Sequence, residues 1–216
     1  MKKRRMLYVA AGLLAGFILW TVLVRFVDVR AIGPRGSYVG FSALNGYIHH
    51  LTGVNMALYT VTDWLGTIPL CFALGFSVLG LCQWIKRKSI LKVDRGILAL
   101  GGFLAAVAVV YIFFEIFIVN YRPVLINGYL EASYPSSTTM LSMCVMPACA
   151  ILLCFYIKGK TKRKCVCISV ALFVAFMVLG RFLSGVHWFS DIIGGALIST
   201  GLVMLFYVIY NELKKS

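Results

Sequence analysis

One apolar stretch decides the fold class: residues 96–119 read GILALGGFLAAVAVVYIFFEIFIV, with Glu115 as the only charged side chain. A helix of about 20 apolar residues crosses the hydrocarbon core of a bilayer. Five other apolar runs have a similar length, so we expect spans at residues 7–27, 64–85, 96–119, 138–157, 165–182 and 188–210. The predicted fold class is all-α, a polytopic membrane bundle of six transmembrane helices.

The composition excludes a water-soluble domain. Of the 216 residues, 61% are hydrophobic and 13% are charged, and the mean hydropathy is +0.92. Soluble domains are typically about 45–50% apolar and about 25% charged. Six spans of about 20 residues each leave only short connections between them, so we expect a single membrane domain over residues 1–216.

The net charge of +14 is concentrated in blocks between the apolar runs. The blocks lie at residues 1–5, 86–95, 158–164 and 214–215, which is typical of cytoplasmic loops and not of a nucleic-acid-binding surface. Five of the 21 Lys and Arg then face outward: Arg25, Arg30, Arg35, Arg122 and Arg181. We expect both termini in the cytoplasm, a bacterial plasma (cytoplasmic) membrane, and no nucleic-acid partner.

The connection between the first two spans is long and runs from Asp28 to Asp63. Its Gly-Pro-Arg-Gly sequence at 33–36 indicates a turn. Apolar residues then recur at helical spacing over 41–51 and predict an amphipathic helix that ends at Gly53. This helix either lies flat in the outer interface above a lipid-facing site or is a connector that packs on the bundle.

Three outward-facing segments carry polar groups. The first is Asn-Tyr-Arg-Pro at 120–123, where Arg122 alone is better explained as an interfacial residue that reaches for water. The second is Tyr-Pro-Ser-Ser-Thr-Thr at 134–139, which predicts a helix start. The free N–H groups of a helix start bind phosphate well, although the motif by itself is simply a good cap.

The third segment, GRFLSGVHWFSD at 180–191, places His187 four residues before Asp191. If the last helix starts near His187, the two side chains share a face and Asp191 accepts a hydrogen bond from one imidazole nitrogen. The other nitrogen is then a nucleophile or a base. Gly195 and Ser199 continue the Asp191 face with small residues, which predicts close packing against a neighbouring helix.

The order of these segments resembles the type 2 phosphatidic acid phosphatase superfamily of membrane lipid phosphatases. The family pattern is Lys, six residues, Arg-Pro; then Pro-Ser-Gly-His; then Ser-Arg, five residues, His, three residues, Asp. The matching residues lie in a phosphatase-like core over 96–210, and they are Arg122-Pro123, Pro135-Ser136, Arg181, His187 and Asp191.

The resemblance implies the roles of these residues. His187 attacks phosphorus and forms a phosphohistidine, and Asp191 orients it. Arg122 and Arg181 clamp the phosphoryl oxygens, assisted by the Ser136 hydroxyl and the N–H groups near Ser137. Two Arg forks suit phosphoryl transfer, which needs chiefly positioning and positive charge. No metal and no cofactor is implied.

The chain departs from the family pattern at Glu115, where lysine is expected, and at Thr138, where the general-acid histidine is expected. Gly180 replaces a serine and Ser137 a glycine. An alkoxide, with a parent pKa of about 16, needs a proton in order to leave, whereas a phosphate, with a pKa of about 6, hardly does. Thr138 therefore favours diphosphate lipids such as polyprenyl diphosphates, unless Glu115 is the acid. Alternatively, Glu115 pairs with Arg122.

Three functions remain open at this stage. The first is a lipid phosphatase that acts on a lipid phosphate or diphosphate among membrane lipids. The second is a lipid phosphotransferase, in which an alcohol replaces water as the acceptor. The third is a non-catalytic lipid-phosphate binding or transport protein, favoured by the lost Lys and His and opposed by the retained His187, Asp191 and two arginines.

Overall fold

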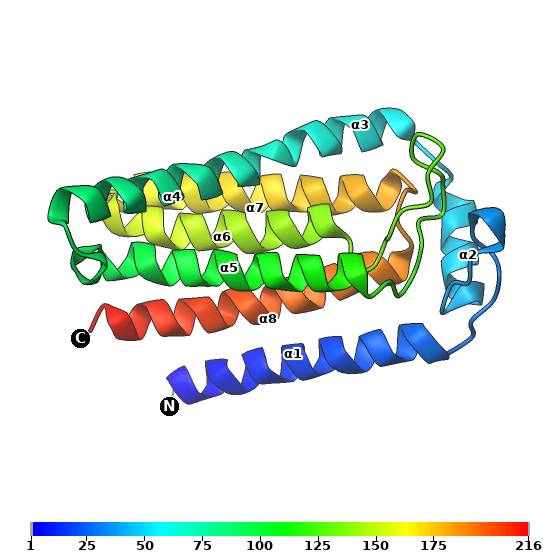
Figure 1. Ribbon diagram of the computed structural model, residues 1–216, viewed down its shortest axis with the longest axis horizontal. Helices are drawn as coiled ribbons and strands as arrows, with labels where there is room; N and C mark the ends of the chain where they lie inside the picture. Colours follow the sequence, from blue (N-terminus) through cyan, green and yellow to red (C-terminus); the bar gives the residue numbers. More distant parts are fainter. Residues whose placement is uncertain (1, 216) are drawn as a thin grey trace.

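The computed structural model describes residues 2–215 and confirms the all-α fold class over that range. Figure 1 shows the long helices running side by side and a shorter helix, α2, set across one end of them. The helices in chain order are α1 (Lys2–Phe26), η1 (Pro34–Gly36), α2 (Ser42–Thr52), α3 (Met56–Leu65), α4 (Thr67–Arg87), η2 (Ile90–Lys92), α5 (Arg95–Ile116), α6 (Ser137–Tyr156), α7 (Lys160–Leu183) and α8 (Phe189–Leu213).

Within residues 2–215, six helical segments are long and apolar enough to cross a membrane, as predicted. They are Lys3–Phe26, Met56–Arg87, Arg95–Ile116, Ser137–Tyr156, Lys160–Leu183 and Phe189–Leu213. The second begins earlier than the predicted residue 64, because α3 and α4 form one span bent at Gly66. The apolar pattern did not predict this additional helix, because Thr60, Thr62 and Asp63 are polar. The third ends at Ile116 instead of residue 119.

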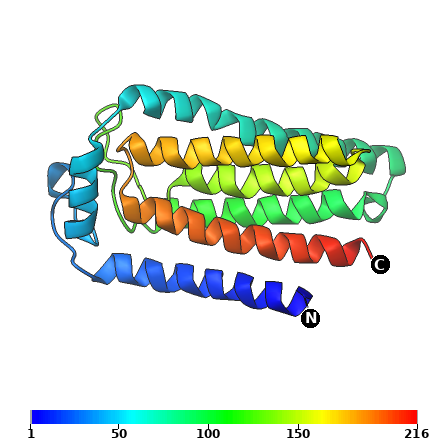
Figure 2. The same ribbon diagram turned by 180° about the vertical axis from the view of Figure 1, so that it is seen from behind.

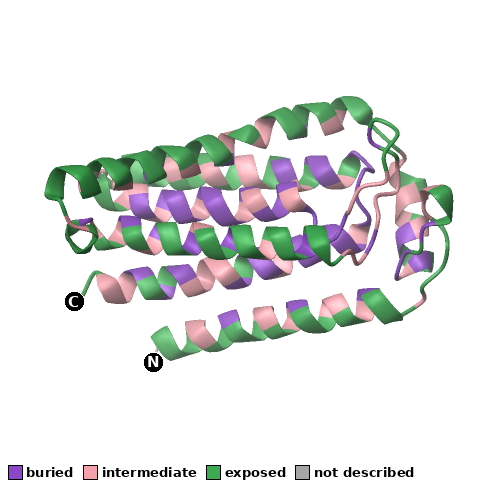
Figure 3. Ribbon diagram, in the orientation of Figure 1, coloured by how far each residue is buried: buried purple, intermediate pink, exposed green. Residues whose placement is uncertain are grey.

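The centre of the bundle is formed by α6 and α8, each of which buries more residues than any of the other helices (Figure 3). These two helices pack closely because α8 presents small residues to α6, as the sequence predicted. A Cβ atom added to Gly195 would lie 3.2 Å from Thr139 Cγ2, and the Ser199 hydroxyl donates to the Met140 carbonyl at 3.4 Å. Seen from behind, α1 lies along the outer side of α8 (Figure 2).

The two ends of the bundle differ. Both termini lie at one end, and α2 and the loops that precede α6 and α8 lie at the other (Figure 1). The turn expected at residues 33–36 is the 3-10 helix η1, and the amphipathic helix expected before Gly53 is α2. Asn45 of α2 is fully buried against the first turn of α8. The helix thus packs on the bundle, as the connector alternative required, while Tyr47 and Leu51 remain exposed.

Candidate active site

Backbone hydrogen bonds bring the three sequence motifs together at the α2 end of the bundle. The segment between α5 and α6 folds back on itself, with Ser133 N–H donating to the Asn120 carbonyl at 2.9 Å and Arg122 N–H donating to the Glu131 carbonyl at 3.0 Å. At the start of α6, Ser136 N–H donates to the Asp191 carbonyl at 3.1 Å. The first two motifs are therefore fixed to the third, near the start of α8.

His187 lies in the short loop between α7 and α8 with its side chain buried. Its Nδ1 atom is 3.1 Å from the carbonyl oxygen of Ser133 and 3.1 Å from the Ser133 hydroxyl. A carbonyl oxygen only accepts, so we assign the ring proton to Nδ1. Nε2 is buried without a hydrogen-bond partner among the described residues, and its lone pair is free to attack.

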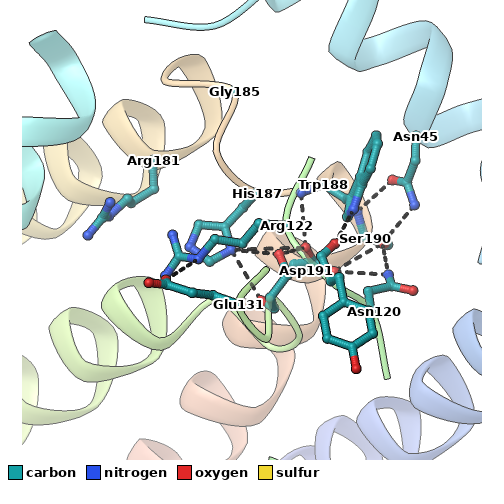
Figure 4. Close-up of polar contacts among 12 residues, drawn as sticks. Asn45, Asn120, Arg122, Glu131, Arg181, Gly185, His187, Trp188, Ser190 and Asp191 are labelled. Atoms are coloured by element: carbon teal, nitrogen blue, oxygen red, sulfur yellow. Dashed lines mark hydrogen bonds and ion pairs between the residues drawn. The ribbon is translucent and has the colours of Figure 1, made fainter. Parts of the chain in front are cut away.

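The environment of His187 keeps its imidazole neutral. Burial is the main cause that lowers the pKa of His187 well below its usual value, and the positive charges of Arg122 and Arg181 lower this pKa further. The Ser133 carbonyl opposes the shift by accepting from the ring. A neutral ring is the form that acts as a nucleophile, and Figure 4 shows the two arginines gathered beside it.

Asp191 is fully buried in the first turn of α8, where four groups donate to its carboxylate. Oδ2 accepts from the Ser133 hydroxyl at 2.5 Å and from Trp188 N–H at 2.9 Å. Oδ1 accepts from Asn120 Nδ2 at 3.1 Å and from the Ser190 hydroxyl at 3.4 Å. The carboxylate therefore joins the segment between α5 and α6 to the loop between α7 and α8.

The predicted hydrogen bond between Asp191 and His187 is absent among the described contacts. Asp191 Oδ2 is 4.0 Å from His187 Nδ1, too far for a hydrogen bond. The prediction assumed that both residues lie on the last helix, but α8 begins at Phe189 and leaves His187 in the loop. Ser133 lies between the two groups, so Asp191 contacts the imidazole through the Ser133 hydroxyl.

Arg122 pairs with a different carboxylate from the one expected. Its Nε is 3.1 Å from Glu131 Oε2, and no ion pair of residues 2–215 joins it to Glu115. The seven-residue spacing suggested one helix, but α5 ends at Ile116, and the folded-back segment places Glu131 opposite Arg122. Glu115 instead lines a small cavity with Ser133 and Ser137.

Arg181, on the last turn of α7, is almost completely buried and is held on one side. Its Nη2 donates to Asp63 Oδ1 and to Thr138 Oγ1, each at 2.6 Å. The guanidinium carbon also lies 4.8 Å from the centre of the Tyr59 ring, in the geometry of a cation–π contact. Thr138, at the position of the family histidine, therefore bonds to this arginine.

The first turn of α6 lies beside these groups. Ser136 occupies the N-cap position, but its side chain makes no capping hydrogen bond. Its hydroxyl is buried and has no partner among residues 2–215. The N–H groups at the start of α6, from Ser137 onward, carry the positive end of the helix dipole.

Several buried polar atoms of this site have no hydrogen-bond partner within residues 2–215: Arg122 Nη1, Arg181 Nε, Arg181 Nη1, Ser136 Oγ and His187 Nε2. Buried polar groups in proteins are nearly always hydrogen-bonded. Four of these five atoms are donors, and they come from three separate motifs. Such a set fits an anion with several oxygen atoms, and the guanidinium groups fit phosphate in particular.

Comparison with known proteins decides the family. The family model described as PAP2 superfamily matches residues 96–215, more than half of the chain. The chain belongs to the PAP2 superfamily. The resemblance carried by the three motifs is thereby confirmed, and this PAP2 chain is a multi-pass membrane protein of a phosphatase superfamily.

The whole PAP2 chain also shares its fold with a solved structure, a transmembrane PAP2-type phosphatidylglycerolphosphate phosphatase from Bacillus subtilis. The two chains are 20% identical, with a TM-score of 0.65, over 97% of this chain and 98% of the other. A comparison with curated protein sequences found no match.

Residues that contact the predicted site residues but were not predicted to belong to the site include Ser133, Asn120, Glu131, Asp63 and Tyr59. Asn120 begins the first quoted segment and Ser133 directly precedes the second, so polar residues in or next to each motif were the available signal. Nothing in the spacing pointed to Asp63, because it reaches the site from a helix that was not predicted.

Proposed function

We propose that this PAP2 protein is a membrane lipid phosphatase that works through a phosphohistidine. The observation that carries the proposal is the cluster of buried, unpartnered donors around the free Nε2 of His187. In the first step the Nε2 lone pair forms an N–P bond while the bond between phosphorus and the leaving oxygen breaks. In the second step water attacks phosphorus and forms a new P–O bond, the N–P bond breaks and its electron pair returns to Nε2, and the proton that the water loses passes to an oxygen of the phosphate product.

The two arginines supply the electrostatic part of this reaction. Arg122 Nη1 and Arg181 Nε and Nη1 bind the phosphoryl oxygens, where negative charge accumulates in the transition state. The Ser136 hydroxyl and the N–H groups at the start of α6 bind the same group. Asp191 acts through Ser133, which keeps the ring proton on Nδ1 in both steps. We propose that the reaction needs neither a metal nor a cofactor.

The preferred substrate on this proposal is a diphosphate lipid such as a polyprenyl diphosphate. The Thr138 hydroxyl bonds to Arg181 and is far too weak an acid to protonate an alkoxide. A leaving phosphate needs no such proton, since its pKa is about 6. Glu115, which is exposed next to the cavity lined by Ser133 and Ser137, is the alternative donor. Glu115→Gln distinguishes these two explanations. Loss of turnover with retained substrate binding would show that Glu115 is the proton donor.

The active site faces outward in this proposal, in a bacterial plasma membrane. The basic blocks lie at the end that holds the termini, opposite His187, and such blocks favour the cytoplasm. The substrate is then a lipid phosphate or diphosphate whose headgroup lies in the outer leaflet.

The test is phosphate release by detergent-purified protein from a polyprenyl diphosphate and from phosphatidic acid. We expect His187→Ala to lower turnover by at least about 10³-fold, as expected for removal of a nucleophile. His50→Ala is the matched control, because His50 is exposed on α2. Equal turnover of the two lipids contradicts the diphosphate preference. No release from either lipid by folded protein contradicts the phosphatase and favours phosphotransfer or binding.

A further inference from the structure

Two of the departures from the family pattern lie against the same helix, α3. A Cβ atom added to Gly180 would lie 2.6 Å from the methyl group of Thr62, which is fully buried. A serine at 180 therefore requires either α3 or the side chain of Thr62 to shift. Thr138 also meets this span, since its methyl group lies 3.5 Å from a Cβ added to Gly66 at the end of α3.

The close approach of α3 brings a carboxylate to Arg181. Asp63 Oδ1 lies 2.6 Å from Arg181 Nη2, and the Arg181 side chain is 1% exposed whereas that of Asp63 is 58% exposed. Tyr59, one helical turn before Asp63, covers the face of the same guanidinium group. A buried arginine thus has its counter-charge on a helix that lies outside the three family motifs.

The contacts divide the nitrogen atoms of Arg181 into two groups. Nη2 is occupied twice, by Asp63 and by Thr138. Nε and Nη1 are buried and have no partner among the described residues. A guanidinium group is planar and rigid. The two hydrogen bonds of Nη2 and the Tyr59 ring over the guanidinium plane therefore fix the direction in which Nε and Nη1 donate.

We propose that Asp63 is a positioning residue for the phosphatase reaction, and that it holds Arg181 so that Nε and Nη1 take the phosphoryl oxygens. This rests on the phosphatase function proposed above. The side chain of Thr138 is smaller than that of the family histidine. Gly180 on α7 lets α3 approach closely, and α3 thereby brings Asp63 into the space around Arg181. The helix α3 is therefore part of the active site of this chain.

The test compares Asp63→Ala with Asp63→Asn in turnover of a diphosphate lipid. Misplacing a binding group by about 1 Å can cost about 10²-fold in rate, so we expect Asp63→Ala to lower kcat by about 10- to 100-fold. Asp63→Asn keeps an oxygen that accepts from Nη2, and we expect it to recover most of that loss. Thr60→Ala is the matched control, because Thr60 is exposed on α3 and bonds only to the Met56 carbonyl.

A second measurement does not depend on turnover. We expect Asp63→Ala to weaken binding of inorganic phosphate, measured by calorimetry, relative to Thr60→Ala, with Asp63→Asn close to the unchanged protein. If lipid turnover is absent and phosphate binding still depends on Asp63, the phosphatase function fails and the positioning role stands. Unchanged or increased kcat in Asp63→Ala overturns the proposal. So does equal loss in Asp63→Ala and Asp63→Asn, because Asn keeps the size and the accepting oxygen of Asp63, and the loss would then come from the missing charge and not from the contact that holds Nη2.

Discussion

At the scale of single residues, the charges around His187 determine how its protonation depends on pH. Burial and the charges of Arg122 and Arg181 lower its pKa, and Asp191, at 4.0 Å, is the nearest carboxylate. An unperturbed histidine has a pKa of about 6.5 and is half protonated there. With a lowered pKa, His187 remains neutral and nucleophilic at pH 6.5 and below.

We therefore expect the imidazole of His187 to titrate well below pH 6.5 in the protein without substrate. The measurement is NMR of ring-labelled histidine in detergent, with the His187 signal assigned from its loss in His187→Ala. A His187 signal that titrates at or above pH 6.5 contradicts this prediction. The titration of the substrate phosphate does not enter this measurement.

The Ser133 hydroxyl lies between Asp191 and His187, so its removal should affect the proposed reaction. Ser133→Ala deletes the hydroxyl between Nδ1 and Oδ2 but keeps the carbonyl that accepts from the ring. A hydrogen bond to a charged group is worth about 1.5–3 kcal/mol, so we expect kcat to fall by at least about tenfold. Ser77→Ala, an exposed serine on α4, is the control and should have no effect.

A double-mutant comparison tests the route through Ser133. If Asp191 acts through this hydroxyl, Ser133→Ala combined with Asp191→Ala should turn over no more slowly than Asp191→Ala alone. Losses that simply multiply would show that Asp191 and Ser133 act separately on the reaction.

At the scale of elements, α2 holds the start of α8 in place. Asn45 accepts from Ser190 N–H at 3.1 Å and donates to the Ser190 hydroxyl at 2.9 Å and to the Gly40 carbonyl at 2.7 Å. His49 Nε2 lies 3.1 Å from the Gly185 carbonyl in the loop that carries His187. Residues far apart in the sequence thus fix the loop through one short helix.

We expect Asn45→Ala to destabilise the protein, because it leaves a buried N–H group and a buried carbonyl without partners. Each unsatisfied group costs about 1–3 kcal/mol, so the thermal midpoint in detergent should fall measurably. Tyr47→Ala, which removes an exposed side chain from the same helix, should leave the midpoint unchanged. An Asn45→Ala midpoint equal to that of Tyr47→Ala contradicts the anchoring role of α2.

The sequence predicted elements better than contacts. Apolar runs predict spans because a bilayer requires them, and all six were correct in number and order. The position of α3 was not predictable in this way, since Thr62 and Asp63 interrupt the apolar pattern with side chains that contact α7. The partners predicted for Asp191 and Arg122 were wrong for a related reason. Helical spacing was applied to His187 and Arg122, which lie in loops whose paths depend on the whole fold.

At the scale of the whole molecule, charge and chemistry are separated along the bundle. The basic blocks of the sequence lie in segments at the end that holds both termini (Figure 1). Five of the 21 Lys and Arg lie outside these blocks: Arg25, Arg30, Arg35, Arg122 and Arg181. Two of those five, Arg122 and Arg181, lie in the candidate active site. Lysine and arginine near the ends of spans favour the cytoplasmic side, so the charge distribution predicts an outward-facing site.

The orientation can be tested with a membrane-impermeant maleimide applied to whole cells that express the protein. Tyr129→Cys places a thiol on an exposed residue of the loop between α5 and α6, at the site end. We expect this variant to be labelled from outside, because the loop should face outward. The unchanged protein is the control: its exposed Cys165 and Cys167, near the start of α7 at the opposite end, should react only after the membrane is permeabilised. If the unchanged protein is labelled in intact cells and Tyr129→Cys adds no further labelling, the site faces the cytoplasm. The lipid headgroup would then have to be presented from the inner leaflet.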